Sequence, residues 1–164
     1  MTFPSINNAA SALVLYEALL LDEKKWAAWL DLFTDDAVLW VPAWKSELET
    51  TGDPENELNL LYLRGRAGLE DRVFRIEAGD SFASVPLDRT VHVVSGPIVT
   101  GESNGELEVA ASWLCHVYGI RGSFTRGGRY EYRLRNTDHG LKIARKKIIM
   151  IDDKLEGPVD VFHV

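Results

Sequence analysis

Four side chains in this sequence of 164 residues have the chemistry for acid–base catalysis: Asp36, His92, His116 and Tyr118. A histidine takes up and releases a proton near neutral pH, and a carboxylate beside it can hold its ring in place. If these residues line a pocket, they predict a site for dehydration, isomerisation or cyclisation of a small molecule, or a binding site without chemistry. The alternative for each of them is a hydrogen bond that supports the fold, and this structural role is the interpretation we favour.

Other kinds of site have less support in the sequence. The four histidines lie more than 20 residues apart, and no C-x-x-C or H-E-x-x-H spacing occurs, so we expect no metal ion in this chain. The glycines of "RGRAG" do not match a phosphate-binding loop. Cys115, the single cysteine, falls on the apolar face of a predicted strand, where we expect a small buried side chain rather than a nucleophile.

The stretch "GLEDRVFRI", in the middle of the chain, combines acids and arginines as a catalytic cluster would. On a helix, at about 100° per residue, Asp71 and Arg75 become an i,i+4 pair, and Glu70 can pair back to Arg66. Ion pairs along one helix therefore explain these charges. Phe74 is the exception, because it lies about 140° from Leu69 on the apolar stripe of this helix and needs a partner from elsewhere.

Composition narrows the classes of function. Hydrophobic residues make up 46% and charged residues 26% of the chain, as in an ordered globular protein. The formal net charge of −7 argues against nucleic acid as the main partner, since binding to its backbone relies on an excess of Lys and Arg. No apolar run approaches the roughly 20 residues of a membrane span, and the N-terminus lacks the pattern of a signal peptide. Because there is also a single cysteine, we expect a cytoplasmic protein that does not associate with a membrane.

The elements that would position the candidate residues fall into two parts of the chain. Apolar residues in the first third recur every three or four positions, which predicts two helices. Asn8 or Ser11 is expected to cap the first helix, and Asp22 the second. From Arg89 onward the period is two, which predicts long strands joined by turns.

The predicted strands assign side chains to opposite faces of a sheet. In "GELEVAASWLCHVYGI", Trp113 and Cys115 belong to the apolar face, whereas His116 and Tyr118 belong to the other face. The segment "GRYEYRLRN" alternates in the same way. In "LKIARKKIIMIDD", apolar residues of both parities from Ile148 onward predict a β-bulge or a strand that leaves a one-sided sheet.

Helices first and long antiparallel strands afterwards predict an α+β fold, with a curved sheet wrapped around the N-terminal helices. No internal repeat or linker interrupts the chain, so we expect a single domain over residues 1–164.

Five segments together resemble the small (beta) subunit of bacterial aromatic-ring-hydroxylating dioxygenases, in the branch of the benzoate, toluate and anthranilate dioxygenases. In chain order the segments are "LLDEKKWAAWLDLFTDDAVLWVPAW", "DPENELNLLYLRGRAGLEDRVFRI", "RTVHVVS", "ASWLCHVYG" and "RKKIIMIDDKLEGPVDVFHV". The resemblance implies a cone-like fold of the nuclear-transport-factor type, also called cystatin-like, with a mixed or antiparallel sheet.

The resemblance also implies partners. These would be a large alpha subunit and two further copies of this chain, so that a homotrimer of small subunits forms part of a hetero-hexamer. The Rieske iron–sulfur cluster and the non-haem iron of such an oxidoreductase belong to the alpha subunit, and a chain with one cysteine cannot supply the cluster ligands. The implied role is structural, without a cofactor or catalytic residues in this chain. The expected subunit interface consists of Glu70, Asp71, Arg72, Phe74, Arg75 and His163.

Two arrangements would separate this role from the alternative, a stand-alone dehydratase, isomerase or small-molecule binding protein. An open cavity into which His92 or His116 points, hydrogen-bonded to an acid, favours the alternative. An interior filled by Trp and Tyr side chains, with Phe74 at a subunit contact, favours the structural role.

Overall fold

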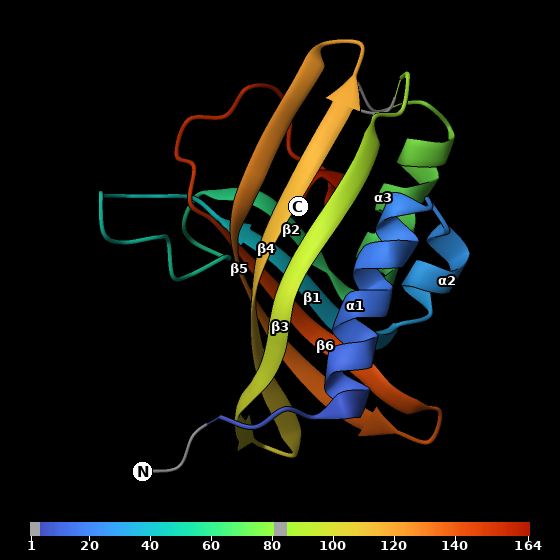
Figure 1. Cartoon of the computed structure of the whole chain (residues 1–164), viewed down its shortest axis with the longest axis vertical. Helices are drawn as coiled ribbons and strands as arrows, with labels where there is room; N and C mark the ends of the chain where they lie inside the picture. The colour runs from blue at the N-terminus through green and yellow to red at the C-terminus, as the bar shows by residue number, and fades with distance from the viewer. Residues whose placement is uncertain (1–3, 81–84) are drawn as a thin grey trace.

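The structure is a computed structural model that describes residues 4–80 and 85–164. These residues form a curved sheet of six strands that carries three α-helices on one face (Figure 1). In chain order the elements are α1 (Asn8–Asp22), α2 (Trp26–Leu30), β1 (Phe33–Pro42), β2 (Asn59–Arg64), α3 (Gly65–Glu77), β3 (Arg89–Ser103), β4 (Glu106–Gly119), β5 (Gly122–Thr137), β6 (Gly140–Met150) and the 3-10 helix η1 (Val161–His163). The predicted α+β class, with N-terminal helices on a curved sheet, is confirmed.

The strand order places the first strand, β1, beside the last strand, β6, within the sheet. The order is β2-β1-β6-β5-β4-β3, with β1 parallel to β6 and all other neighbours of this sheet antiparallel. The predicted turn between β3 and β4 is tight, because Asn104 and Gly105 both take positive φ angles of 54° and 73°. Helix α1 packs against β3 and α3 against β1, so the helices cover the inner face.

The predicted helix caps are wrong in both cases. Asn7, rather than Asn8 or Ser11, caps α1, because its Oδ1 atom accepts the backbone N–H of Ala10 at 3.0 Å. Asp22 is the last residue of α1, and α2 begins without a side-chain cap. The carboxylate of Asp22 is engaged with a distant strand instead, as described below.

The faces of β4 and β5 agree with the predicted alternation. The inward side chains are buried: Val109, Ala111, Trp113, Cys115, Val117, Tyr130, Tyr132 and Leu134. His116 and Tyr118 are exposed on the opposite face of β4.

Strand β6 contains a β-bulge, but earlier than we predicted. Its register against β5 shifts between Ile143 and Arg145, so Ala144 is the extra residue. Because successive strand residues point to opposite faces, this insertion turns Lys146 and Ile148 inward. Lys146 is consequently buried.

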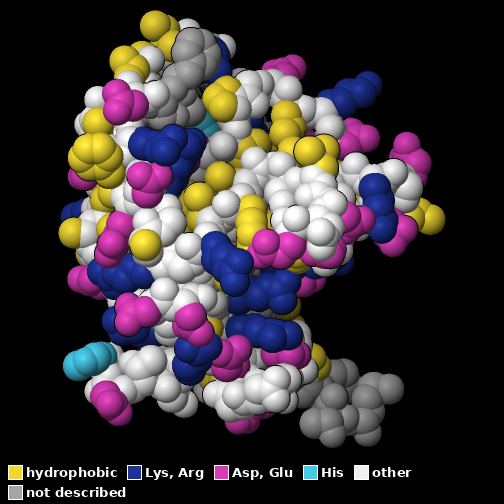
Figure 2. Space-filling view, turned by 180° about the vertical axis from the view of Figure 1, so that it is seen from behind, with side chains coloured by type: hydrophobic (Ala, Val, Ile, Leu, Met, Phe, Trp, Pro, Cys, Tyr) yellow, Lys and Arg dark blue, Asp and Glu magenta, His cyan; other side chains and the backbone are white. Residues whose placement is uncertain are grey.

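Charged and hydrophobic side chains gather on different parts of the surface. Figure 2 shows Lys, Arg, Asp and Glu side chains intermixed over the lower half of the face seen from behind, and hydrophobic side chains gathered in its upper half.

Candidate functional site

The end of α1 and strand β3 bring Asp22 and His92 together. Nδ1 of His92 lies 2.6 Å from Oδ1 of Asp22, and the backbone N–H of His92 donates to Oδ2 at 2.8 Å. Burial by itself raises the pKa of the Asp22 carboxyl, but the hydrogen bonds from His92 outweigh it, and the pKa lies below its ordinary value. Asp22 is therefore ionised at neutral pH. In a neutral ring oriented this way, Nε2 is a free proton acceptor, as acid–base catalysis requires.

Nε2 of His92, however, is sealed from solvent. The side chain is 0% exposed, and Nε2 has no hydrogen-bond partner among the residues that the structure describes. Nε1 of Trp113 and the hydroxyl of Tyr130 are likewise buried without a partner in this part of the chain, and the two rings stack with centroids 5.2 Å apart. The dyad has the right geometry, but no substrate can reach it in this conformation.

The C-terminal tail (residues 160–164) closes one end of the interior. All five of its residues are buried. The ring centroids of Phe162 and Trp26 lie 6.2 Å apart. Nζ of Lys24 lies 4.8 Å from the ring centroid of Phe162. In Figure 1 the red end of the chain returns into the space between the curved sheet and the helices. The tail therefore occupies space that an open cone would leave for a ligand.

Two polar contacts hold the C-terminal tail. The guanidinium of Arg72 on α3 donates two hydrogen bonds to the buried carboxylate of Asp160. Nε2 of His163 lies 2.9 Å from Oδ2 of Asp88. Burial lowers the pKa of His163 to about 4, although Asp88 acts in the opposite direction, so this ring is neutral at pH 7.

The rest of the interior holds a buried ion pair. Nζ of Lys146 lies 3.0 Å and 2.9 Å from the two carboxylate oxygens of Glu17 on α1. Nε1 of Trp29 donates to the same carboxylate at 2.8 Å, and the hydroxyl of Tyr132 does so at 3.1 Å. The ammonium also lies 4.3 Å from the ring centroid of Tyr130. The charges of this pair are thus occupied by one another and by aromatic donors, which is the arrangement of a structural core.

The other acid–base candidates lie apart from His92. Asp36 on β1 binds the guanidinium of Arg135 at 2.9 Å and 3.1 Å on the surface. On the outer face of β4, His116 is within 3.0 Å of the hydroxyl of Thr125, and Tyr118 is exposed. The partner that does meet His92, Asp22, was predicted to be a helix cap. No local pattern could have identified it, because the contact joins residues 70 positions apart.

The other candidates for chemistry are the Cys115 thiol and possible metal ligands. Burial raises the pKa of the Cys115 thiol to about 12, so the thiol stays protonated and unreactive at neutral pH. Among the described residues, no group of three or more His, Cys, Asp and Glu side chains could hold a metal ion. Within the same residues, no helix is long and apolar enough to cross a membrane.

Comparison with known proteins decides the family. The sequence profile of the family described as the ring hydroxylating beta subunit matches residues 16–156. The chain belongs to this family. It is 33% identical over 153 residues to the small subunit of 2-halobenzoate 1,2-dioxygenase from Burkholderia cepacia, covering 93% of both chains. It is 34% identical over 158 residues to the small subunit of anthranilate 1,2-dioxygenase from Acinetobacter baylyi, covering 95% of this chain and 96% of that one.

Solved structures agree with this assignment. The crystal structure of the beta subunit of benzoate 1,2-dioxygenase from Burkholderia mallei superimposes with a TM-score of 0.77 at 31% identity, over 99% of this chain and 100% of that one. A putative scytalone dehydratase from Novosphingobium aromaticivorans reaches a TM-score of 0.63 at 16% identity, over 94% of this chain and 91% of that one, which indicates a shared fold. Another neighbour is described as NTF2-like with a cystatin-like fold, at a TM-score of 0.62 and 16% identity. The predicted cone-like fold is confirmed for this ring-hydroxylating beta subunit.

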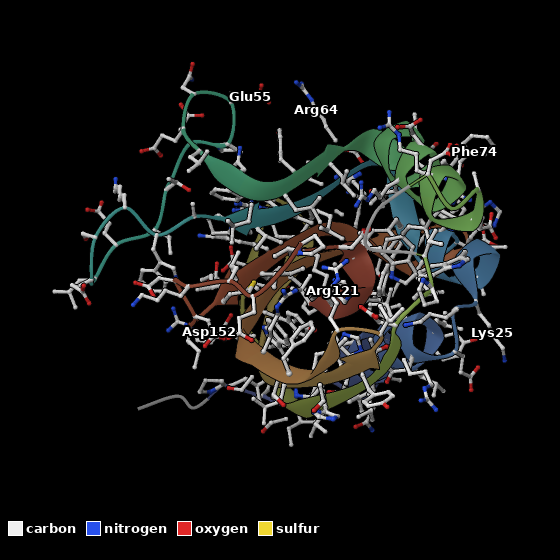
Figure 3. All side chains as sticks on the ribbon, turned by 90° about the horizontal axis from the view of Figure 1, so that it is seen from above. Lys25, Glu55, Arg64, Phe74, Arg121 and Asp152 are labelled. Atoms are coloured by element: carbon white, nitrogen blue, oxygen red, sulfur yellow. The ribbon has the colours of Figure 1, made fainter. Side chains whose placement is uncertain are left out.

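Helix α3 of this beta subunit exposes four of the six side chains that we predicted to form a subunit interface. The two predicted ion pairs are confirmed, with Arg75 to Asp71 at 3.1 Å and Arg66 to Glu70 at 2.9 Å. Phe74 is 66% exposed and points outward from α3 in Figure 3.

Two further residues of the predicted interface have contacts inside the chain. Arg72 binds Asp160, and His163 is buried against Asp88. Both hold the C-terminal tail. The exposed part of the predicted surface therefore consists of Glu70, Asp71, Phe74 and Arg75.

Proposed function

We propose that this chain is the structural small subunit of a multicomponent Rieske non-haem iron dioxygenase that hydroxylates an aromatic ring, and that it catalyses no step itself. The observation that carries the proposal is the sealing of the Asp22–His92 dyad in a chain of this family. Nε2 of His92 is buried without a hydrogen-bond partner among the described residues. The interior also holds the C-terminal tail, the Glu17–Lys146 pair and aromatic rings. A small subunit that organises other chains needs no accessible site of its own.

The partner in this proposal is a large alpha subunit that holds the Rieske cluster and the non-haem iron. The relatives named above are small or beta subunits of dioxygenases, which supports such a pairing. We further propose that residues 1–164 form one domain, that three copies form a homotrimer within a hetero-hexamer, and that the complex works in the cytoplasm. Because the relatives are subunits of dioxygenases named for 2-halobenzoate, anthranilate and benzoate, an aromatic carboxylate is the substrate class we propose for the complex.

The dyad itself is the observation that favours the alternative, a stand-alone cone-fold enzyme or binding protein. His92 is hydrogen-bonded to an acid, as that alternative needs. The alternative also needs an open cavity into which His92 points. The described residues leave no such opening, since the His92 side chain is fully buried. The balance therefore favours the structural role.

Purification of the chain alone and together with the large subunit tests the proposal. Light scattering after gel filtration should show that the isolated chain self-associates, and elemental analysis should find no stoichiometric iron in it. The mixture should elute as one larger species in which the iron accompanies the large subunit. Stoichiometric iron in the isolated chain, or separate elution of the two chains, would contradict the proposed role.

A further inference from the structure

The C-terminal tail reaches the strand position next to the Asp22–His92 dyad. The backbone oxygen of Phe162 lies 4.0 Å from Sγ of Cys115. Cys115 is the residue opposite His92 in the pairing of β3 with β4. Side chains opposite each other in an antiparallel pair lie on the same face, with Cβ atoms about 4.5–5.5 Å apart. Phe162 therefore covers the immediate neighbour of His92 on the inner face of the sheet.

A series of contacts also joins the tail to the acid of the dyad. Nζ of Lys24 lies 4.8 Å from the ring centroid of Phe162 and donates to the hydroxyl of Thr90 at 2.8 Å. This hydroxyl donates to Oδ1 of Asp22 at 2.9 Å, and the same oxygen lies 2.6 Å from Nδ1 of His92. The ring of Phe162 thus packs against a group that helps to hold the dyad in place.

The connection between the tail and the sheet has no regular structure. Residues 151–159 form no helix or strand, and none of them is buried. Within the described chain, no backbone hydrogen bond joins residues 152–164 to another element. The tail can therefore leave its place without breaking any strand pairing of the sheet.

Side-chain contacts fasten the tail, and solvent reaches one of them. Arg72 on α3 binds the carboxylate of Asp160, and Nε2 of His163 lies 2.9 Å from Oδ2 of Asp88. A pocket of about 220 Å³ is lined by both Asp88 and His163, so this second contact faces solvent there. Segments held by few hydrogen bonds open at a lower free energy than the whole fold.

We propose that the C-terminal tail is a lid whose local opening exposes the Asp22–His92 dyad to small molecules while the sheet stays folded. With the lid closed, Nε2 of His92 is sealed and has no hydrogen-bond partner among the described residues. With the lid open, the same atom accepts a hydrogen bond from a hydroxyl or amine of a molecule that enters. The proposal concerns the isolated chain, so its outcome is independent of assembly with a large subunit.

Labelling of Cys115 measures the opening in the unaltered, full chain. This thiol is the single one in the sequence, is fully buried and lies under Phe162, so an aromatic disulfide reagent reaches it after an opening. Through the lid, the labelling rate should stay nearly constant in low concentrations of urea, because a local opening exposes little surface. Global unfolding exposes far more surface, so a rate that rises steeply with urea from the lowest concentrations would overturn the proposal.

Two variants of α3 test whether the opening belongs to the tail. Arg72→Gln leaves the buried carboxylate of Asp160 without its cation and should speed the labelling of Cys115 about tenfold or more. Arg75→Gln, which alters an exposed ion pair of the same helix, should leave the rate unchanged. Equal rates in folded Arg72→Gln and in the parent chain would contradict a lid that this contact holds.

Leu134→Ala separates the local from the global route. Leu134 is fully buried and lies eight positions along β5 from Arg126, the partner of Cys115 in the sheet, which is about 26 Å at the rise of a strand. The lost packing destabilises the closed and the open form alike, so labelling through the lid should keep its rate. Labelling through global unfolding would become roughly 30-fold faster or more, and that acceleration would count against the lid. If a variant does not fold, the urea dependence of the unaltered chain still decides between the routes.

Modification of His92 tests the access to the dyad itself. Diethyl pyrocarbonate acylates an unprotonated imidazole nitrogen, and mass spectrometry of the peptides locates the adduct. His92 should react faster in folded Arg72→Gln than in the parent chain, by the same factor as Cys115. The exposed ring of His139 should react equally in both chains. Labelling of Cys115 without modification of His92 would show that the opening does not uncover the dyad.

Discussion

At the scale of single residues, the interior depends on how completely Glu17 and Lys146 satisfy each other. Burying two charges costs about as much as their attraction returns, so a buried pair adds little stability by itself. What stabilises this one is the set of extra donors, since Trp29 and Tyr132 both bind the Glu17 carboxylate. Removing one member would leave the other charge without compensation in a dry interior.

We expect Lys146→Met to destabilise the domain by about 3–5 kcal/mol, because it leaves the Glu17 carboxylate buried without a cation. The double variant Glu17→Gln with Lys146→Met should recover much of this loss. A glutamine keeps an oxygen that can accept from Trp29 or Tyr132 and carries no charge. Urea unfolding of the two variants and the parent chain measures the difference. Equal loss in the single and the double variant would mean that the charge is not the cause.

The residues of the dyad show the limit of prediction at this scale. His92 could be chosen from the sequence because histidine is the side chain that titrates near neutral pH. Asp22 could not be chosen in this way. It lies between the two predicted helices, where a carboxylate is expected to act as a helix cap. Glu17 lies in an apolar stretch and its partner in the run "RKK", so neither gives a sequence signal for the pair. Contacts between distant residues define the site, and a pattern within one element does not contain them.

At the scale of elements, the strands could be predicted better than their irregularities. The alternation in β4 and β5 gave the buried face correctly, because period two follows from strand geometry. The apolar run from Ile148 predicts the bulge too far along β6, because the register shift lies at Ala144. Ile149 and Met150 are in fact buried along with Ile148, and Trp44 donates to the backbone oxygen of Met150. The true bulge at Ala144 carries no special residue type.

The C-terminal tail is the element whose stability should respond to pH. His163 has a pKa of about 4 in the folded chain and an ordinary value of 6.5, because burial disfavours its charged form. Between these values the unfolded chain binds more protons than the folded chain, so stability is present at neutral pH and is lost as the pH falls from 6.5 to 4. The charged groups that face the ring are Asp88, Asp160 and Arg126.

We therefore expect the unfolding free energy to fall by about 2 kcal/mol more in the parent chain than in His163→Gln when the pH is lowered from 7 to 4.5. The variant lacks the titrating ring, whereas its amide can still donate to Asp88. Urea unfolding at the two pH values provides the comparison. His139→Gln, a change in an exposed turn, should behave as the parent chain does. An identical loss in parent and His163→Gln would show that the tail does not depend on this ring.

At the scale of the whole molecule, the surface is suited to more than one neighbour. Apolar side chains are exposed on α1, on α3 and on the outer faces of β3 and β4: Leu15, Tyr16, Leu19, Phe74, Val91, Val93, Leu114 and Tyr118. Val93 and Leu114 lie opposite each other across β3 and β4, and large exposed apolar patches mark contacts between chains. A small subunit that touches both its own copies and a large subunit needs at least two such surfaces, which supports the proposed hetero-hexamer.

Family and fold could be predicted at this scale because the resembling segments extend over nearly the whole chain. The docking surfaces were harder to predict. Tyr16 follows the helical spacing of the apolar residues in α1 but is half exposed. Arg72 and His163, two residues of the predicted interface, hold the C-terminal tail. An apolar or charged residue has the same sequence signature whether its partner belongs to its own chain or to another.

Phe74 is the sharpest test of assembly, because its ring is 66% exposed although the flanking ion pairs of α3 are already satisfied. We expect Phe74→Ala to change the unfolding free energy by no more than about 0.5 kcal/mol, as for other surface substitutions. Buried aromatic anchors of interfaces contribute about 2 kcal/mol or more, so binding to the large subunit should weaken at least tenfold. Leu48→Ala, at a side chain that is 93% exposed in a loop, is the matched control and should bind as the parent does. Gel filtration and binding titration of the mixed subunits measure both variants. Unchanged affinity in Phe74→Ala would remove α3 from the interface and leave the apolar surfaces of α1 and of β3–β4 as the contacts to examine.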